Sequence, residues 1–279
     1  MPGSFTRTME RNGRRSHEPD WSVNTMKKSV TYKGNPISFA EYGDSNGFPV
    51  LVQHGMIASI EDSHLFQPLI DAGVKLVCTA RPGYGDSFPV KFQSISEWAA
   101  VTEALSTELA LGSFDILAMS SGAPYGYAIA SGLPGKTRNV FIFSGTPALY
   151  DEKVRSVWPY PLDADPSVED MQKLARELFF SGVSEDADLP NDVQDSMRNN
   201  CFGPGLDMAI RARDWGFALS EMDAQVYMRH SQEDQIVPPE SAKLTAQLIP
   251  NCELELDEGQ HFSPEDLARF IHDRMLKHY

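Results

Sequence analysis

Several familiar site motifs are missing from this chain of 279 residues, and each absence narrows its possible function. The sequence has no run of about 18 apolar residues, so no segment is long enough for a membrane-spanning helix. No Gly-x-Gly-x-x-Gly follows a candidate strand and no P-loop is present, which argues against these nucleotide sites. The seven histidines show no zinc-ligand spacing, so we expect neither a metal nor a cofactor.

Cysteine and positive charge are both scarce. Three cysteines give no disulfide framework and suit a reducing compartment. The N-terminal segment lacks the apolar stretch of a secretory signal, so we expect a cytoplasmic protein. With 39 acidic against 24 basic residues the formal charge is −15, which repels phosphate backbones and anionic lipid surfaces. A small-molecule substrate is therefore expected rather than nucleic acid or membrane, while monomer and homodimer both stay open.

Short β-rich runs alternate with amphipathic helical stretches along the chain, without an internal repeat. This alternation predicts a mainly parallel sheet with helices on its faces. The predicted strands are residues 29–32, 37–42, 49–53, 74–79, 114–118, 140–143, 225–229 and 254–256, of which the first two form a hairpin. The predicted helices are residues 61–72, 98–109, 122–129 and 240–248, with a last helix that has Ser263 as its N-cap and Pro264 at its first position.

Residues 147–222 interrupt this alternation. They contain Trp158-Pro159-Tyr160-Pro161, a helix capped by Ser167 and a loop-rich acidic section. We expect them to form a lid inserted into one domain, whose core comprises residues 26–146 and 223–279. Residues 1–25 are expected to be a flexible tail without a role in chemistry.

A candidate nucleophile lies where the central strand meets a helix, in Ala118-Met119-Ser120-Ser121-Gly122-Ala123. An exposed nucleophilic serine needs a sharp, strained strand-to-helix turn with small residues two positions before and after it. Ser120 has Ala118 and Gly122 at these positions, whereas Ser121 would have the bulky Met119. Ser120 is therefore the predicted nucleophile.

A histidine and a carboxylate follow the last two predicted strands. His261 lies directly before the last helix and is the candidate general base. Asp234 follows the preceding strand and is the candidate that orients the imidazole. Glu233 could take its place, whereas Asp223 lies at the wrong end of the strand. The order Ser, Asp, His is that of α/β hydrolases.

The remaining site predictions concern the oxyanion and the substrate. The backbone amides of Met56 and Ser121 are the expected oxyanion donors. Loop shaping by a ring hydrogen bond is favoured over proton transfer for His54. The aromatic residues of the lid could line an acyl pocket or pack as its core, and packing is favoured; the candidate substrate contacts are His54, Trp158, Tyr160, Phe179 and Trp215.

Five motifs stand in a characteristic order: Gln53-His54-Gly55-Met56, Arg81-Pro82-Gly83-Tyr84-Gly85-Asp86-Ser87, Ser120-Ser121-Gly122-Ala123-Pro124, Asp234-Gln235-Ile236-Val237-Pro238 and Gly259-Gln260-His261-Phe262. With them, residues 28–279 resemble the α/β-hydrolase superfamily, in its capped, esterase-like branch. The resemblance implies an α/β fold with an eight-stranded, mostly parallel sheet, helices on both faces and a helical cap. Ala118 and Ser231 stand where the family pattern often has glycine, and Gln260 separates Gly259 from His261.

The leading functional hypothesis is a serine hydrolase that cleaves an ester or related acyl bond of a small, apolar substrate through an acyl-enzyme. The same triad could instead hydrolyse a C–C, amide or thioester bond or act as a perhydrolase, because fold does not choose among these reactions. A non-catalytic ligand receptor on a hydrolase scaffold is the third hypothesis. Ser120 argues against the dehalogenase and epoxide-hydrolase branches, whose nucleophile is an aspartate.

Overall fold

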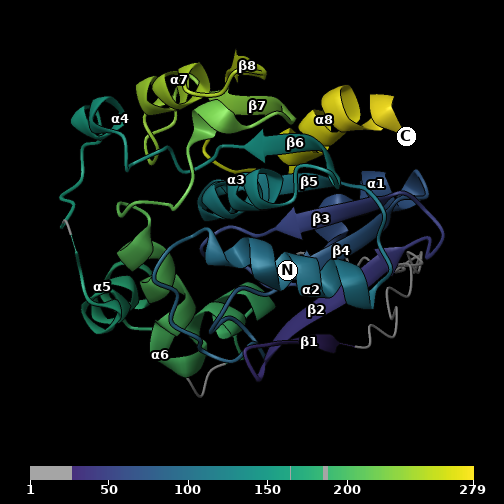
Figure 1. The fold of residues 1–279 in the computed structure, drawn as a ribbon. Helices are drawn as coiled ribbons and strands as arrows, with labels where there is room; N and C mark the ends of the chain where they lie inside the picture. Colours follow the sequence, from purple (N-terminus) through teal and green to yellow (C-terminus); the bar gives the residue numbers. More distant parts are fainter. Residues whose placement is uncertain (1–26, 164, 185–187) are drawn as a thin grey trace, which may run out of the picture.

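An eight-stranded sheet forms the centre of the computed structural model, which describes residues 27–163, 165–184 and 188–279 (Figure 1). The tail expected at residues 1–25 lies outside the described residues. The strands lie in the order β1 (Lys28–Tyr32), β2 (Asn35–Gly43), β4 (Lys75–Thr79), β3 (Pro49–Gln53), β5 (Phe114–Met119), β6 (Thr137–Phe143), β7 (Gln225–Ser231) and β8 (Cys252–Asp257). Strand β2 is antiparallel to both of its neighbours, and β3 to β8 pair in parallel. The predicted sheet and its leading hairpin are confirmed.

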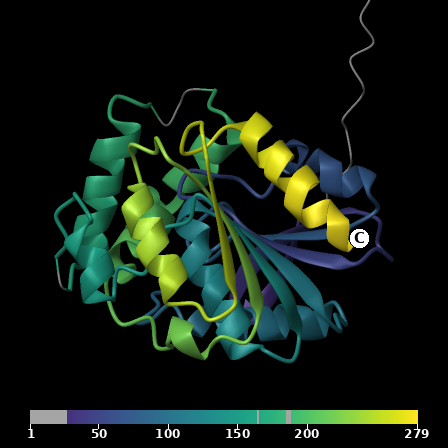
Figure 2. The same cartoon turned by 90° about the horizontal axis from the view of Figure 1, so that it is seen from above.

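Helices cover both faces of this sheet. One layer contains α2 (Glu97–Glu108), α3 (Ala123–Gly132) and α7 (Pro239–Gln247), and the other contains α1 (Gln67–Asp71) and α8 (Pro264–Phe270). Figure 2 shows the yellow α8 on one side of the twisted sheet and the yellow-green α7 on the other. Neighbouring residues of β5 point to opposite faces, so Ile116 packs in the first layer and Leu117 in the second. Both faces are therefore buried, as in parallel sheets generally.

Two helix starts depend on serine and proline. Ser263 accepts a hydrogen bond from the Asp266 amide at 3.0 Å and Pro264 occupies the first turn of α8, as predicted. The helix expected at residues 61–72 is shorter. It consists of a 3₁₀ turn, η1 (Ser63–Phe66), followed by α1. Pro68 lies in the first turn of α1, where its missing N–H costs no helical hydrogen bond.

The segment between β6 and β7 contains α4 (Glu152–Ser156), α5 (Val168–Phe180), α6 (Asn191–Ile210) and the 3₁₀ turn η3 (Leu219–Glu221). In Figure 1, α5 and α6 lie beyond the carboxyl ends of the parallel strands. Ser167 caps α5 as predicted, accepting from the Asp170 amide at 3.0 Å.

Besides the helix capped by Ser167, the sequence predicts only a loop-rich acidic section here, whereas the structure also has the long helix α6. The helix is interrupted at Asn199 and Asn200, whose φ angles are +52° and +56°. Asparagine adopts this left-handed conformation more readily than most residues. These asparagines, with Pro204 inside the helix, hide the helical pattern from sequence reading. Within the described residues, every helix is too short or too polar to cross a lipid bilayer.

Candidate active site

Ser120 lies on a sharp turn between β5 and α3. Its φ is +47°, a left-handed conformation that is strained for a side chain with a Cβ. The turn brings α3 so close to β3 that a Cβ on Gly122 would lie 2.3 Å from the carbonyl oxygen of Gln53. Only glycine fits there. Across the turn, a Cβ on Gly126 would lie 2.9 Å from that of Ala118, so Gly126 leaves the room that the Ala118 methyl needs.

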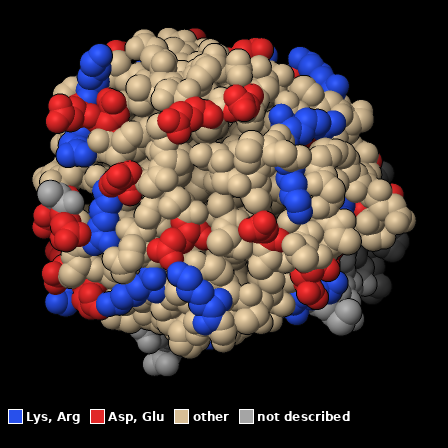
Figure 3. Space-filling model, viewed as in Figure 1, with Lys and Arg blue, Asp and Glu red and all other residues tan. Residues whose placement is uncertain are grey.

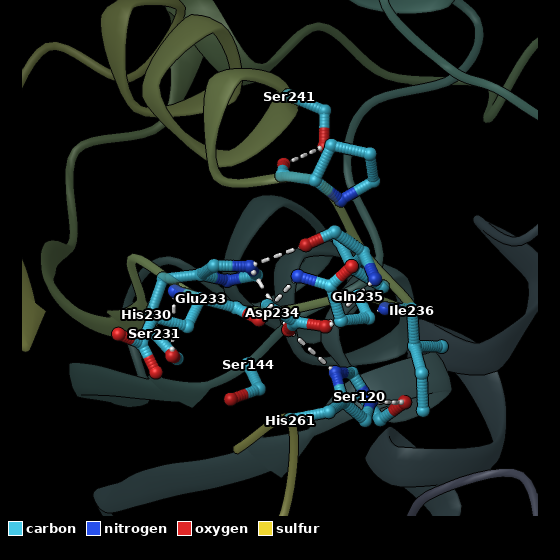
Figure 4. A network of polar contacts seen from close by, with 12 residues as sticks. Ser120, Ser144, His230, Ser231, Glu233, Asp234, Gln235, Ile236, Ser241 and His261 are labelled. Atoms are coloured by element: carbon cyan, nitrogen blue, oxygen red, sulfur yellow. Dashed lines mark hydrogen bonds and ion pairs between the residues drawn. The ribbon is translucent and has the colours of Figure 1, made fainter. Parts of the chain in front are cut away.

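The side chains of Ser120, His261 and Asp234 form a continuous chain of hydrogen bonds (Figure 4). Ser120 Oγ lies 2.9 Å from His261 Nε2, and His261 Nδ1 lies 2.7 Å from Asp234 Oδ2. These residues follow β5, β8 and β7, whose carboxyl ends meet at one edge of the sheet. The structure thus brings together the three residues that the sequence placed at strand ends.

The carboxylate of Asp234 is buried and accepts several hydrogen bonds. The amides of Ile236 and Val237 donate to Oδ1 at 2.8 and 2.9 Å. Burial acts to raise the pKa of Asp234, but hydrogen bonds from His230, His261 and the Val237 amide outweigh it and hold the pKa well below its usual range. Asp234 is therefore a carboxylate at neutral pH. Of the alternatives, Glu233 is exposed and Asp223 precedes β7.

The last residues of β7 support this carboxylate and the histidine loop, and sequence reasoning overlooked them. His230 is fully buried, with Nε2 3.1 Å from Asp234 Oδ2 and 2.8 Å from the Val237 carbonyl oxygen. Since both neighbours are acceptors, Nε2 carries the proton. Ser231 Oγ donates to the Gly259 carbonyl at 2.6 Å, and Arg229 donates to that of Gln260 at 3.3 Å. In the sequence, the three successive polar residues Arg229, His230 and Ser231 at the end of an otherwise largely apolar strand could have indicated this supporting role.

The two amides expected to bind the oxyanion belong to peptide units of fixed orientation. The C=O and N–H of a planar trans peptide point in opposite directions. The Thr146 amide donates to the Ser120 carbonyl oxygen at 2.9 Å, which turns the Ser121 N–H the other way. Arg81 Nη2 donates to the Gly55 carbonyl oxygen at 2.9 Å, which does the same for the Met56 N–H. Gly55 lies beside Ser120, since a Cβ on it would be 3.8 Å from the serine Cβ.

His54 and Trp215 lie in places that do not suit substrate contact. His54 is buried, with Nδ1 2.7 Å from the Gly55 carbonyl oxygen and Nε2 3.2 Å from the Arg81 amide nitrogen. Burial, and then the Arg81 charge, lower its pKa well below the usual value. This placement supports loop shaping, the interpretation that the sequence favoured. Trp215 is fully buried and packs against Tyr127, with ring centroids 6.3 Å apart, so it belongs to the core.

The other aromatic candidates separate into two groups. Tyr160 is exposed and its hydroxyl donates to the Gln235 carbonyl at 3.1 Å, beside the Asp234 loop. Trp158 packs edge-on against Tyr160, with ring centroids 5.2 Å apart. Phe179 lies on α5 and packs edge-on against Phe180 instead. Of these aromatic residues, Tyr160 and Trp158 are therefore placed next to the Asp234 loop.

Metal ligands of the usual kind do not gather anywhere in the part of the chain that the structure describes. No group of three or more His, Cys, Asp or Glu side chains there has a geometry that could hold a metal ion.

Comparison of the sequence with curated proteins finds distant relatives. The uncharacterized hydrolase YcgS of Bacillus subtilis is 25% identical over 158 residues, which are 57% of this chain and 50% of that protein. A non-heme chloroperoxidase of Streptomyces lividans is 23% identical over 255 residues, covering 84% of this chain and 92% of that protein. The chain thus spans about half of YcgS and nearly all of the chloroperoxidase. No model of a protein family matches the sequence.

Solved structures resemble the fold along most of the chain. The bromoperoxidase of Bacillus anthracis superposes with a TM-score of 0.69 at 20% identity, covering 91% of this chain and 98% of that one. The esterase of Exiguobacterium antarcticum gives a TM-score of 0.67 at 19% identity, covering 90% and 100%. The predicted fold is confirmed by these likenesses and by the strand order, which together show that the chain has the α/β-hydrolase fold.

Proposed function

We propose that this protein is a serine hydrolase that cleaves an ester or related acyl bond of a small, apolar substrate through an acyl-enzyme intermediate. The observation that carries the proposal is the hydrogen-bond chain from Ser120 through His261 to Asp234, with distances of 2.9 and 2.7 Å. A serine hydroxyl is a weak nucleophile until a neighbouring base accepts its proton. His261 is within reach of that proton, and Asp234 is placed to orient the imidazole.

The reaction follows from this geometry. His261 Nε2 accepts the Ser120 proton while Oγ attacks the substrate carbonyl carbon, and the amides of Met56 and Ser121 stabilise the oxyanion. The tetrahedral intermediate collapses, the leaving group takes the proton from His261, and an acyl-serine remains. Water then repeats the two steps, with His261 as base and then as acid, and releases the carboxylic acid.

Asp234 acts in this scheme as a permanent anion. Its lowered pKa keeps the carboxylate ionised, so it stabilises the imidazolium that forms when His261 takes up the serine proton. The hydrogen bond to Nδ1 also fixes the neutral imidazole in the tautomer whose Nε2 accepts the proton.

Exposed apolar side chains beside the triad support an apolar substrate. Ile57, Ile236 and Phe262 are 39%, 56% and 40% exposed. Each lies next to, or two residues from, a proposed site residue, and Figure 4 shows Ile236 beside Ser120 and His261. Acidic and basic side chains are interspersed over the face of the molecule that Figure 3 shows. We infer that residues 147–222 form the cap, since Tyr160 within them contacts the Asp234 loop.

Hydrolysis of p-nitrophenyl esters with short and long acyl chains tests the proposal. We expect turnover by the wild type and a loss of at least about 10⁴-fold in kcat for Ser120→Ala. Thermal unfolding of the variant should stay close to that of the wild type, which separates lost chemistry from lost folding. Undiminished turnover by Ser120→Ala would exclude Ser120 as the nucleophile. A protein that binds a small molecule but hydrolyses no ester, C–C, amide or thioester substrate would favour the receptor hypothesis.

A perhydrolase is the second candidate, favoured by the names of the similar proteins, which include a non-heme chloroperoxidase and a bromoperoxidase. In this reaction hydrogen peroxide replaces water as the attacking group on the acyl-enzyme and releases a peracid, which can oxidise a halide. Bromination of a dye in the presence of acetate, hydrogen peroxide and bromide is the assay. If the protein is a perhydrolase, bromination should depend on Ser120. Equal bromination rates with the wild type and Ser120→Ala would exclude this function.

A further inference from the structure

A buried ion pair lies behind the oxyanion loop, and the mechanism above does not use it. Arg81 follows β4 and Asp207 lies on α6, 126 residues further along the chain. Both side chains are buried, with Nη2 2.6 Å from Oδ2 and Nε 3.2 Å from Oδ1. The pair therefore connects the sheet core to the segment inserted between β6 and β7.

Arg81, together with Tyr84, holds the loop after β3 by hydrogen bonds to the carbonyl groups of that loop. Arg81 donates to the carbonyl oxygens of His54 at 2.5 Å and Gly55 at 2.9 Å. The Tyr84 hydroxyl oxygen lies 3.0 Å from the carbonyl oxygen of Met56, within hydrogen-bond distance. Three successive carbonyls are thus hydrogen-bonded, and that of Gly55 belongs to the same peptide unit as the expected Met56 N–H donor and points away from it.

Asp207 gathers further donors around the guanidinium. The Tyr125 hydroxyl donates to Oδ1 at 2.6 Å, and the Tyr84 hydroxyl, 2.9 Å from Oδ2, shares its one proton between Oδ2 and the Met56 carbonyl oxygen. Burial and then the charge of Asp207 raise the pKa of both tyrosines well above the usual value, so both remain donors. Ser121, the residue after the nucleophile, lies with Oγ 3.1 Å from Arg81 Nη2 and 3.3 Å from Asp207 Oδ2. We call these five residues the Arg81 cluster: Arg81, Tyr84, Ser121, Tyr125 and Asp207.

We propose that Arg81 and Asp207 are positioning residues for the oxyanion hole, an inference that rests on the proposed hydrolase function. Arg81 holds the Gly55–Met56 peptide so that its N–H faces Ser120, and Asp207 neutralises Arg81 and fixes its fork geometry. The same cluster holds Ser121, the other expected donor, by its side chain. A residue of the inserted segment thereby controls how well the transition state is stabilised.

Positioning and stabilisation predict different kinetics. A displacement of about 1 Å of a catalytic group can cost about 10²-fold in rate. An oxyanion donor acts mainly in the transition state, so its displacement lowers kcat and leaves KM nearly unchanged. A boronic acid that forms a tetrahedral adduct with Ser120 should lose affinity in parallel. A purely structural pair would change the unfolding temperature and neither of these quantities.

The test uses two variants, each with a matched control. Asp207→Asn removes the charge, and its control Asp195→Asn changes another buried aspartate of α6, which accepts from Ser59 Oγ at 2.5 Å. Tyr84→Phe deletes one hydroxyl, which contacts both the Met56 carbonyl oxygen and Asp207 Oδ2. Its control Tyr127→Phe deletes a buried hydroxyl whose neighbour is Met228 Sδ at 3.8 Å. Because Tyr84→Phe removes a single hydroxyl, it keeps the inference testable even if Asp207→Asn does not fold.

We expect kcat to fall about 10- to 100-fold for Asp207→Asn and about three- to tenfold for Tyr84→Phe, with boronic acid affinity falling in parallel. Both controls should stay within about twofold of the wild type. The inference is overturned if Tyr84→Phe and folded Asp207→Asn match their controls in kcat and boronic acid affinity. A wild type that neither turns over esters nor binds the boronic acid would instead refute the proposed function, and this inference with it.

Discussion

The two sides of Ser120 are built differently. On one side, His261 and Asp234 come from loops after β8 and β7 and contact each other through side chains. On the other side, the Arg81 cluster is buried, and Arg81 and Tyr84 contact the loop after β3 through its carbonyl groups. We infer that the first side supplies proton transfer and the second supplies preorganised dipoles. Substitutions should therefore separate the two sides by activity, stability and pH dependence.

The largest effect is expected on the His261 side. Asp234→Asn should lower kcat/KM by about 10⁴-fold. The Asp234 oxygens face donors, since two backbone amides contact Oδ1 and two histidines contact Oδ2. Backbone N–H groups cannot accept a hydrogen bond, so an Asn side chain turns its NH₂ group toward the histidines, where it favours the His261 tautomer that is protonated on Nε2. Steady-state hydrolysis of a p-nitrophenyl ester is the measurement.

Glu233→Gln is the control for this change, because Glu233 is the exposed neighbour of Asp234. We expect its kcat/KM to remain within about twofold of the wild type, since exposed charges interact weakly. A larger loss for Glu233→Gln than for Asp234→Asn would transfer the orienting role to Glu233.

A smaller effect, on stability, is expected on the Arg81 side. Asp207→Asn leaves the buried Arg81 charge without its partner and should lower the free energy of unfolding by about 3–5 kcal/mol. Removing both charges in Arg81→Met with Asp207→Leu should restore much of this loss, because apolar pairs often replace buried ion pairs at little cost. Urea denaturation measures both. A double variant less stable than either single variant would contradict this account.

The smallest effect concerns the pH dependence of stability and also belongs to the Arg81 side. The pKa of His54 is lowered by burial and by Arg81, so below about pH 6.5 the unfolded chain binds a proton that the folded protein does not. Folding stability should therefore fall by up to about 2 kcal/mol between pH 6.5 and pH 5. His54→Gln should remove this contribution. Urea denaturation at each pH measures the free energy of unfolding of the wild type and of His54→Gln. The same pH dependence in both would contradict this role of His54.

The His261 side could be predicted from sequence because its residues follow local rules. Parallel strands end at one edge of the sheet, so residues directly after a strand meet there. Ser120 stood out from Ser121 because a strand-to-helix turn needs small neighbours, and the close contact of Gly122 with Gln53 shows why. His261 was marked by its place between the last strand and a capped helix.

The Arg81 side could not be predicted in the same way. Arg81 stood in a recognised motif, but its partner Asp207 lies 126 residues away on α6. That helix itself escaped prediction, because Asn199 and Asn200 interrupt it in a left-handed conformation. A buried ion pair depends on tertiary packing, and no local pattern in the sequence marks which carboxylate meets which guanidinium.

Labelling with a fluorophosphonate probe, followed by peptide mass spectrometry, shows whether Ser120 is the nucleophile. We expect a covalent phosphonyl adduct on Ser120 in the wild type and no adduct in Ser120→Ala. An adduct on Ser121, or undiminished labelling of Ser120→Ala, would contradict this expectation.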